Sequence, residues 1–314
     1  MCLTQKTAGR WLFPRLRQEG VGVKIVDRMV ELIRETSSSL PEDVERVLKT
    51  QLAKEKRAKN AAAVLNLSTI LDNIALARRR GTPLCQDTGT LTFFVDESLR
   101  RNVTPEVLKQ AVAIATEKGY LRRNTIDSVS GRSYDDNVSE GAPVVHYVGA
   151  SRNSRSSRCS RVSRGHVTLL MKGGGSENMS RQYSLPDRTL GAGRDLEGVR
   201  KCLLDAVVKT QGYGCAPGIL GVCVGGDRAT GFETAKLQLL RPLDEKDSRQ
   251  PKELRDLEAR ILREANTLGI GPMGLGGKTT LLGVKIAARP RVPASFFVTV
   301  AYLCWAARRR TIVV

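Results

Sequence analysis

Apolar side chains recur at helical spacing through the first third of the chain. They fall on every third or fourth position of residues 23–36, and the same period continues through 42–57 and 61–79. Ser39 and Pro41 interrupt the first two of these segments, because a proline ends the helix that precedes it. The pattern therefore predicts a helical N-terminal region built of consecutive helices.

The rest of the chain alternates short apolar runs with longer helical segments. The runs typical of strands are residues 91–95, 142–148, 167–171, 219–224, 281–286 and 296–302. Thr104 is expected to cap a helix that continues to Lys118, and further helices are expected at 194–210, 230–241 and 248–267. This order predicts an α+β fold in which the helical N-terminal region packs on a mixed α/β domain.

The composition indicates a globular chain with an aliphatic core. Its 314 residues, 41% of them hydrophobic and 4% aromatic, suffice for one large domain or two modest ones. No run approaches the ~18 consecutive apolar residues of a membrane span, so no membrane association is expected. Seven cysteines without regular spacing do not indicate a secreted disulfide framework, and they favour a reducing, cytoplasmic compartment.

The net charge of +19 would ordinarily indicate a nucleic-acid partner. Much of it is local: residues 1–18 carry four basic side chains and no acid, and residues 151–164 carry five arginines, six serines and no carboxylate. We therefore set apart a basic leader, 1–22, and a Ser/Arg-rich insertion, 151–165, from a main domain at 23–310 and a tail at 311–314.

Three explanations of the Ser/Arg-rich insertion remain open: a disordered insertion, an RNA-attracting arm, or an error in the reading frame of the source sequence. The leader has the arginine content of a transit peptide but a poor apolar face. Nucleic-acid binding through the basic segment is the alternative from a different functional class. Because the chain lacks aromatic interleaving and any recognised RNA or DNA motif, nucleic acid is not an expected partner.

The turn Gly81-Thr82-Pro83-Leu84-Cys85-Gln86-Asp87-Thr88-Gly89-Thr90 carries the densest chemistry. It places a thiol, an amide, a carboxylate and hydroxyls where Pro83 and Gly89 break regular structure, which exposes polar atoms. Four further stretches are rich in glycine or carry cysteine. They are Lys172–Asn178, 214–226 with Cys215, 268–280, and 293–305 with Cys304.

Two glycine-rich runs are candidate sites for binding an anion. Residues 271–280 do not form a phosphate loop, because the required glycine is replaced by Pro272 and no strand precedes the run. The run Gly173-Gly174-Gly175 can turn successive N–H groups toward an anion such as a dicarboxylate.

Taken in order, these five motifs resemble the class I (iron–sulfur) fumarase and L-tartrate dehydratase family, in its alpha subunit or N-terminal catalytic domain. The resemblance covers roughly residues 23–310. It implies an alpha-type, cluster-binding α+β fold and a [4Fe–4S] cluster held by Cys85, Cys215 and Cys304. Three thiolates for four irons leave one iron open as a Lewis acid. Cys202 is interpreted as a helix residue and Cys223 as a small core residue of a strand.

The resemblance also implies the residues that act on the substrate. Gln86, Asp87 and Arg122 are expected to be catalytic, with Arg123 the neighbouring alternative to Arg122 as a carboxylate clamp. The residues expected to bind substrate are Lys172, Gly173, Gly174, Gly175 and Lys278. Neither His146 nor His166 can be carried over as a catalytic residue, and the position where some relatives have histidine is Val292.

The acid/base half of the reaction is missing from these motifs, because the family places it in a β-type domain that nothing in the chain resembles. We therefore expect a hydro-lyase component that adds or removes water on fumarate or malate, inactive alone. A β-type subunit or domain and a homodimeric or α2β2 assembly are the expected partners. An L-tartrate dehydratase alpha subunit is the alternative within the family, and a degenerate relative that no longer loads a cluster is a third.

Overall fold

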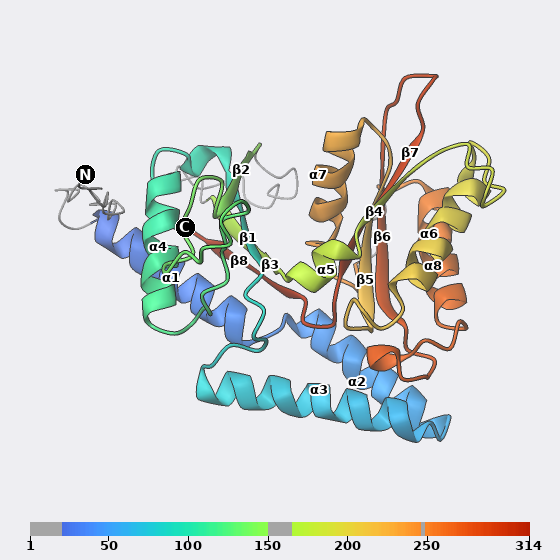
Figure 1. Ribbon diagram of the computed structural model, residues 1–314, viewed down its shortest axis with the longest axis horizontal. Helices are drawn as coiled ribbons and strands as arrows, with labels where there is room; N and C mark the ends of the chain where they lie inside the picture. The colour runs from blue at the N-terminus through green and yellow to red at the C-terminus, as the bar shows by residue number, and fades with distance from the viewer. Residues whose placement is uncertain (1–20, 150–164, 246–248) are drawn as a thin grey trace, which may run out of the picture.

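Two four-stranded sheets stand side by side in the computed structural model, which describes residues 21–149, 165–245 and 249–314 (Figure 1). The first sheet has the order β2-β1-β3-β8 and the second β4-β7-β5-β6. The strands are β1 (Thr90–Asp96), β2 (Val144–Val148), β3 (His166–Lys172), β4 (Arg181–Ser184), β5 (Gly218–Gly225), β6 (Leu281–Arg289), β7 (Phe297–Leu303) and β8 (Arg308–Val313). Only β1–β2 and β5–β6 pair in parallel among the described strands.

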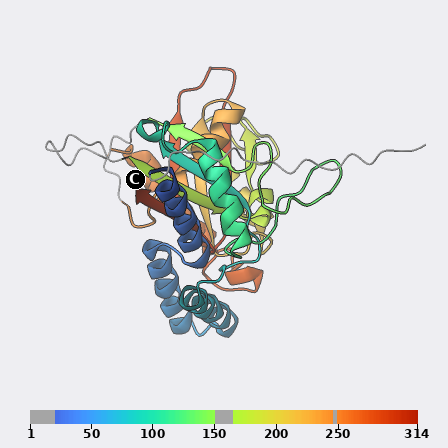
Figure 2. The same ribbon diagram turned by 90° about the vertical axis from the view of Figure 1, so that its left-hand side faces the viewer.

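The three predicted N-terminal helices are confirmed as α1 (Val21–Ser38), α2 (Glu42–Arg57) and α3 (Ala61–Arg80). The helix expected after Thr104 is α4 (Pro105–Glu117), and the Thr104 hydroxyl accepts a hydrogen bond from the amide of Val107. Helices α1 and α4 pack together on the first sheet, around a core that includes Met29, Phe93 and Leu108. Figure 2 views the molecule from this side.

The second sheet is covered on both faces. Helices α6 (Leu196–Thr210) and α8 (Lys252–Ala265) pack on one face, and α7 (Arg228–Gln238) packs on the other. Strand β5 is buried along its whole length, which explains its continuous run of apolar and small residues. Cys202 on α6 and Cys223 on β5 are fully buried, so both are core residues as predicted.

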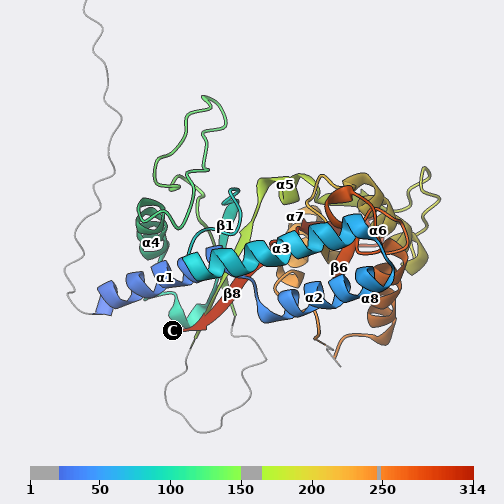
Figure 3. The same cartoon turned by 90° about the horizontal axis from the view of Figure 1, so that it is seen from below.

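Helices α2 and α3 lie beneath the two sheets and join them (Figure 3). Leu48 on α2 and Leu67 on α3 belong to one buried cluster with Phe94 of the first sheet and Leu303 of the second. The chain passes between the sheets in two places, through α5 (Gly174–Asn178), which lies between β3 and β4, and through the short connection from β7 to β8 (Figure 1). The mixture of helix and sheet confirms the α+β class.

The helices predicted at 230–241 and 248–267 are α7 and α8, with ends shifted by two to four residues, and further features of the chain differ from the prediction. The tail expected at 311–314 is wrong, because residues 308–313 form edge strand β8, antiparallel to β3. Strand β4 was not predicted. Val21 and Gly22, assigned to the leader, already belong to α1. The leader up to residue 20 and the insertion at 151–164 lie outside the described residues. Within the described ranges, no helix combines the length and apolar character that a membrane crossing needs.

Candidate functional site

The Cys85 loop connects α3 to β1, and hydrogen bonds fix the position of its first residues. Gly81 ends α3 in the left-handed conformation, with φ at 64°. The Leu84 amide donates a hydrogen bond to the Ser37 carbonyl at 2.8 Å, and the Asn73 side chain donates to the Leu84 carbonyl at 3.0 Å. Both bonds fix the residue next to Cys85, whose side chain is half-buried. The loop is therefore held against the C-terminal end of α1 and the body of α3.

The far end of the loop is fastened to the segment that carries Arg122. The Thr88 hydroxyl accepts from the Arg122 amide and donates to its carbonyl, both at 2.9 Å. The buried Asn137 side chain donates to the same carbonyl at 2.9 Å and accepts from the Asn124 amide at 2.7 Å. The Asn124 side chain reaches Asp87 Oδ1 at 3.4 Å. These bonds fix the Arg122 backbone beside Asp87, while its guanidinium is exposed.

The glycine turn after β3 touches the same loop so closely that side chains would not fit. A Cβ on Gly173 would lie 2.7 Å from Asp87 Oδ2, and a Cβ on Gly89 would lie 2.2 Å from the Lys172 carbonyl oxygen. Gly89 also has a φ of 70°, which glycine adopts without strain. Glycines are thus required here for backbone approach, and Gly174 and Gly175 begin the short helix α5.

Cys215 and Cys304 come to this region on two other connections. Cys215 precedes β5 with a φ of 52°, and its carbonyl accepts a hydrogen bond from the Trp305 amide at 3.3 Å. The Cys304 amide donates to the buried Ser176 hydroxyl of α5 at 3.1 Å. The Met273 amide donates to the Ala216 carbonyl at 2.9 Å, which places the glycine-rich stretch 268–280 against the Cys215 turn.

The thiols of these connections interact electrostatically. Burial raises the pKa of Cys215, and the neighbouring Cys304, Cys85 and Asp87 raise it further. Burial also raises the pKa of Cys304, against the opposing effects of Ser176 and Arg308. A set of three thiols is a donor set suited to iron. As they stand, no three His, Cys, Asp or Glu side chains in the described part of the chain are close enough to hold a metal ion.

Arg308 was not predicted for this region. It is 1% exposed, and its Nη2 donates to the Asp87 carbonyl at 2.7 Å. Its buried Nε has no hydrogen-bond partner among the described residues. In the sequence it opens a run of three arginines that resembles a solvated tail. The β-prone residues Thr311–Val314 were the signal that this run belongs to a strand.

The two lysines predicted to bind substrate are placed differently. Lys172 is 2% exposed; its ammonium donates to Glu177 and, at 3.1 Å, to Ser180. Burial lowers the pKa of Lys172 to about 8, although Glu177 opposes the shift. Lys278 is exposed, and its amide donates to Glu55 of α2 at 2.7 Å, while its ammonium makes no hydrogen bond or ion pair with other described residues. Lys172 is therefore held by Glu177 of α5 and by Ser180, whereas the Lys278 side chain is exposed.

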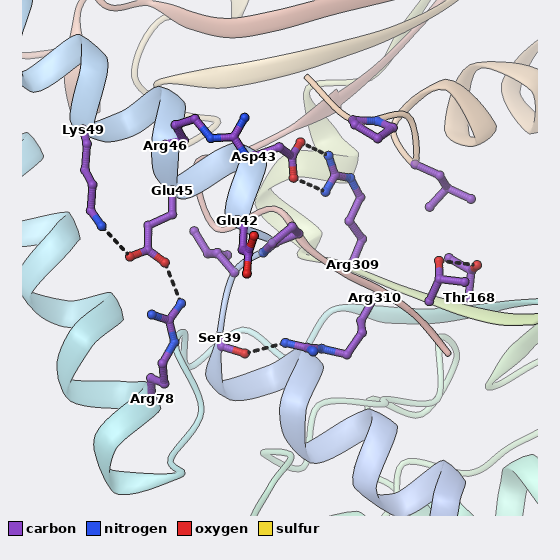
Figure 4. A pocket seen from close by; sticks show the side chains of 15 residues that line it. Ser39, Glu42, Asp43, Glu45, Arg46, Lys49, Arg78, Thr168, Arg309 and Arg310 are labelled. Carbon is purple, nitrogen blue, oxygen red and sulfur yellow. Dashed lines mark hydrogen bonds and ion pairs between the residues drawn. The ribbon is translucent and has the colours of Figure 1, made fainter. Parts of the chain in front are cut away.

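A pocket of about 880 Å³ lies elsewhere, between α2, α3 and β8 (Figure 4). Basic side chains line it, and each is matched by a carboxylate: Arg309 by Asp43 at 2.6 Å, Arg78 and Lys49 by Glu45. Arg46 and Arg310 are likewise paired, with Asp244 and Glu35. The pocket contains none of the predicted site residues, and its ion pairs are those of a helix–sheet junction.

A profile of the family described as fumarate hydratase (Fumerase) matches residues 26–313. The chain belongs to the fumarate hydratase family. Over 291 residues it is 46% identical to a Geobacillus stearothermophilus protein described as a class I fumarate hydratase, covering 91% of this chain and 54% of that one. Two relatives described as L(+)-tartrate dehydratase alpha subunits follow. The one from Methanocaldococcus jannaschii is 32% identical over 294 residues, covering 91% of this chain and 96% of its own.

The alpha subunit from Escherichia coli K12 is 30% identical over 304 residues, covering 95% of this chain and 93% of its own. The chain thus spans about half the length of the Geobacillus fumarate hydratase and nearly all of the two alpha subunits.

In this member of the fumarate hydratase family, Arg122 and Arg123 differ in whether the guanidinium has an ion-pair partner. Arg123 pairs with Asp135 at 3.2 Å, whereas the Arg122 guanidinium has no ion pair among the described residues. The two histidines are engaged elsewhere: His146 faces Glu233 at 3.6 Å and His166 faces Asp96 at 3.2 Å.

Proposed function

We propose that this chain is the alpha component of an iron–sulfur hydro-lyase that adds or removes water on a four-carbon dicarboxylate, fumarate and malate first. The observation that carries the proposal is the meeting of three cysteine-bearing connections. The Trp305 amide, next to Cys304, donates to the Cys215 carbonyl, and Arg308, just beyond Cys304, donates to the Asp87 carbonyl in the Cys85 loop. Membership of the fumarate hydratase family and the 46% identity to a class I relative support it.

In this proposal Cys85, Cys215 and Cys304 hold a [4Fe–4S] cluster in an alpha-type fold. The residues present fit such a group, because they offer three thiols and the buried guanidinium of Arg308, whose Nε has no hydrogen-bond partner among the described residues. When bound, the group supplies an iron without a protein ligand, a Lewis acid for a substrate hydroxyl.

The chain's own polar groups then orient the substrate hydroxyl or water and bind the substrate carboxylates. Gln86 and Asp87 adjoin Cys85 and orient the hydroxyl or water by hydrogen bonds. The exposed guanidinium of Arg122, on its fixed backbone, clamps a substrate carboxylate in bidentate fashion. The exposed backbone of Gly174 and Gly175 leaves room for a substrate carboxylate, next to Gly173, which is buried against Asp87. Lys172 holds this turn through Glu177, and the role of Lys278 stays a prediction.

The acid/base step is assigned to a β-type domain or subunit, which would complete a homodimeric or α2β2 enzyme in a reducing, cytoplasmic compartment. The greater length of the Geobacillus relative and the alpha-subunit names of the other two support this division. We therefore expect the purified chain alone to interconvert malate and fumarate at no measurable rate.

L-Tartrate is the second candidate substrate. It is favoured by one observation, the near-complete coverage of two proteins described as L(+)-tartrate dehydratase alpha subunits. Titration of the reconstituted chain with malate, fumarate and tartrate separates the candidates, because the true substrate should perturb the cluster spectrum at the lowest concentration.

Anaerobic reconstitution tests the proposal as a whole. The full chain should bind about four iron and four sulfide, and Cys85→Ser, Cys215→Ser and Cys304→Ser should each lose most of both. Cys202→Ser is the matched control, because Cys202 is buried in α6 among apolar side chains and should leave the count unchanged. A folded wild-type chain that takes up no iron, or equal loss in all four variants, would contradict the assignment.

A further inference from the structure

Arg308 lies where three parts of the candidate site meet. It begins β8, directly after the β7–β8 connection that carries Cys304. Its Nη2 donates to the carbonyl of Asp87, two residues beyond Cys85, and lies 3.9 Å from the position that a Cβ on Gly173 would occupy. Its charge acts on the Cys304 thiol. The guanidinium therefore hydrogen-bonds to the Cys85 loop and lies near the glycine turn, and its charge acts on Cys304.

The surroundings of this guanidinium do not balance its charge. Arg308 is 1% exposed, its buried Nε has no hydrogen-bond partner, and no carboxylate among the described residues pairs with it. An unpaired charge out of contact with water is costly for a fold. The free energy of that charge falls only if an anionic group occupies the region beside it.

The next residue shows how the same fold satisfies a buried guanidinium. Arg309 is 7% exposed and pairs with both carboxylate oxygens of Asp43, at 2.6 and 3.3 Å. It also donates to the carbonyls of Leu239 and Arg241. Of these two adjacent, buried arginines, Arg309 thus has an anionic partner and Arg308 has none among the described residues.

We propose that the missing anionic partner of Arg308 is the thiolate set of Cys85, Cys215 and Cys304 in the metal-loaded chain. Arg308 is then a positioning residue: it offsets the negative charge of the thiolates and holds the Cys85 loop by the Asp87 carbonyl. This inference rests on the proposed iron–sulfur function, and it concerns the protein side of the site alone.

The test compares Arg308→Met, Arg308→Lys and the control Arg309→Met, each as metal-free and as anaerobically reconstituted full chain. In the metal-free chain, Arg308→Met should leave the Tm unchanged or raise it, because it removes an unpaired charge. Arg309→Met strands the buried Asp43 carboxylate and should lower the Tm by roughly 5 to 10 °C. In the reconstituted chain, Arg308→Met should be the variant with the larger defect, seen in its iron and sulfide content and its reduction potential.

Arg308→Met should then retain less than half of the wild-type iron and sulfide, and its residual cluster should have a more negative reduction potential, read by EPR-monitored titration. Arg308→Lys should recover most of the potential, and Arg309→Met should keep the wild-type iron count per folded chain. A metal-free Arg308→Met chain that loses as much Tm as Arg309→Met would overturn the inference, because the role would be structural only.

Two further outcomes also overturn it. Unchanged iron and potential in Arg308→Met, with loss of the malate-induced spectral change, would make Arg308 a substrate-binding residue instead. Absence of iron from the wild-type chain would fail the proposed function itself, and this result is visible without any variant.

Discussion

The buried Lys172 predicts a specific dependence of folding stability on pH. Burial lowers the pKa of its ammonium from 10.5 to about 8, although Glu177 and Ser180 accept its hydrogen bonds. The charged form is therefore disfavoured by the fold, at a cost of about 3 kcal/mol. The cost is fully present below about pH 8, and it disappears as the pH rises toward 10.5, where the unfolded chain also releases its proton.

The perturbation is Lys172→Met, and the assay is urea unfolding of the metal-free chain from about pH 7.5 to about pH 9.5. Over this range the wild-type free energy of unfolding should rise relative to the variant by about 2 kcal/mol. Cys304 acts with the opposite sign, because burial raises its pKa and its contribution is lost as the pH rises. The burial part of that contribution is present in both chains and cancels in their difference, which leaves only the attraction between Cys304 and Lys172.

Lys236→Met is the matched control. Lys236 pairs with the same Glu177 carboxylate at 2.7 Å, but its side chain is 27% exposed, against 2% for Lys172. Removing it leaves the Lys172 ammonium in place, so the rise with pH should persist. A difference between wild-type and Lys172→Met that stays flat with pH would refute the reasoning, because Lys172 would then titrate in the fold as it does in water.

Two more predictions follow from close contacts. Gly173→Ala should cut iron uptake at least several-fold, since its Cβ would lie 2.7 Å from Asp87 Oδ2, whereas Gly175→Ala, with its Cβ 3.9 Å from the nearest atom, should not; iron analysis of the two folded chains decides this. Asp43→Asn should lower the free energy of unfolding by about 3 kcal/mol, because it leaves Arg309 buried without its anion. As Arg309 holds the pKa of Asp43 low against burial, this difference should be present at neutral pH and shrink below about pH 4 in urea titrations.

Much of the fold could be predicted from local patterns. The helices at 42–57 and 61–79 were predicted to within one residue, because their apolar positions recur at helical spacing and Pro41 marks the start of the first. Strand β5 was found because it is buried on both faces and so is continuously apolar. Such elements carry their own signals, which do not depend on what packs against them.

Strand β8 could not be predicted in the same way. Its first residues, Arg308 and Arg309, are charged, and their burial depends on partners far away in the sequence: Asp43 on α2 and the Asp87 carbonyl in the cysteine loop. For the candidate site, the family motifs pointed to the cysteines and to Gly173, whereas the groups that fasten them were missed. Thr88 and Asn137 act through backbone atoms of Arg122, a relation that no local spacing expresses.

The pairing of β3 with β8 has a consequence for how the chain folds. These strands run antiparallel as the two arms of one hairpin, and residues 173–307 form the loop between them. The second sheet is therefore an insertion within a hairpin of the first. The second sheet, together with the connections that carry Cys215 and Cys304, can form as a local unit. Strand β8 can pair with β3 only after the whole insertion has been synthesised and has become compact. We therefore expect closure of that long loop to be a late step in folding. Because Arg308 of β8 holds the Cys85 loop, a nascent chain that has not yet reached β8 should not complete the cysteine site.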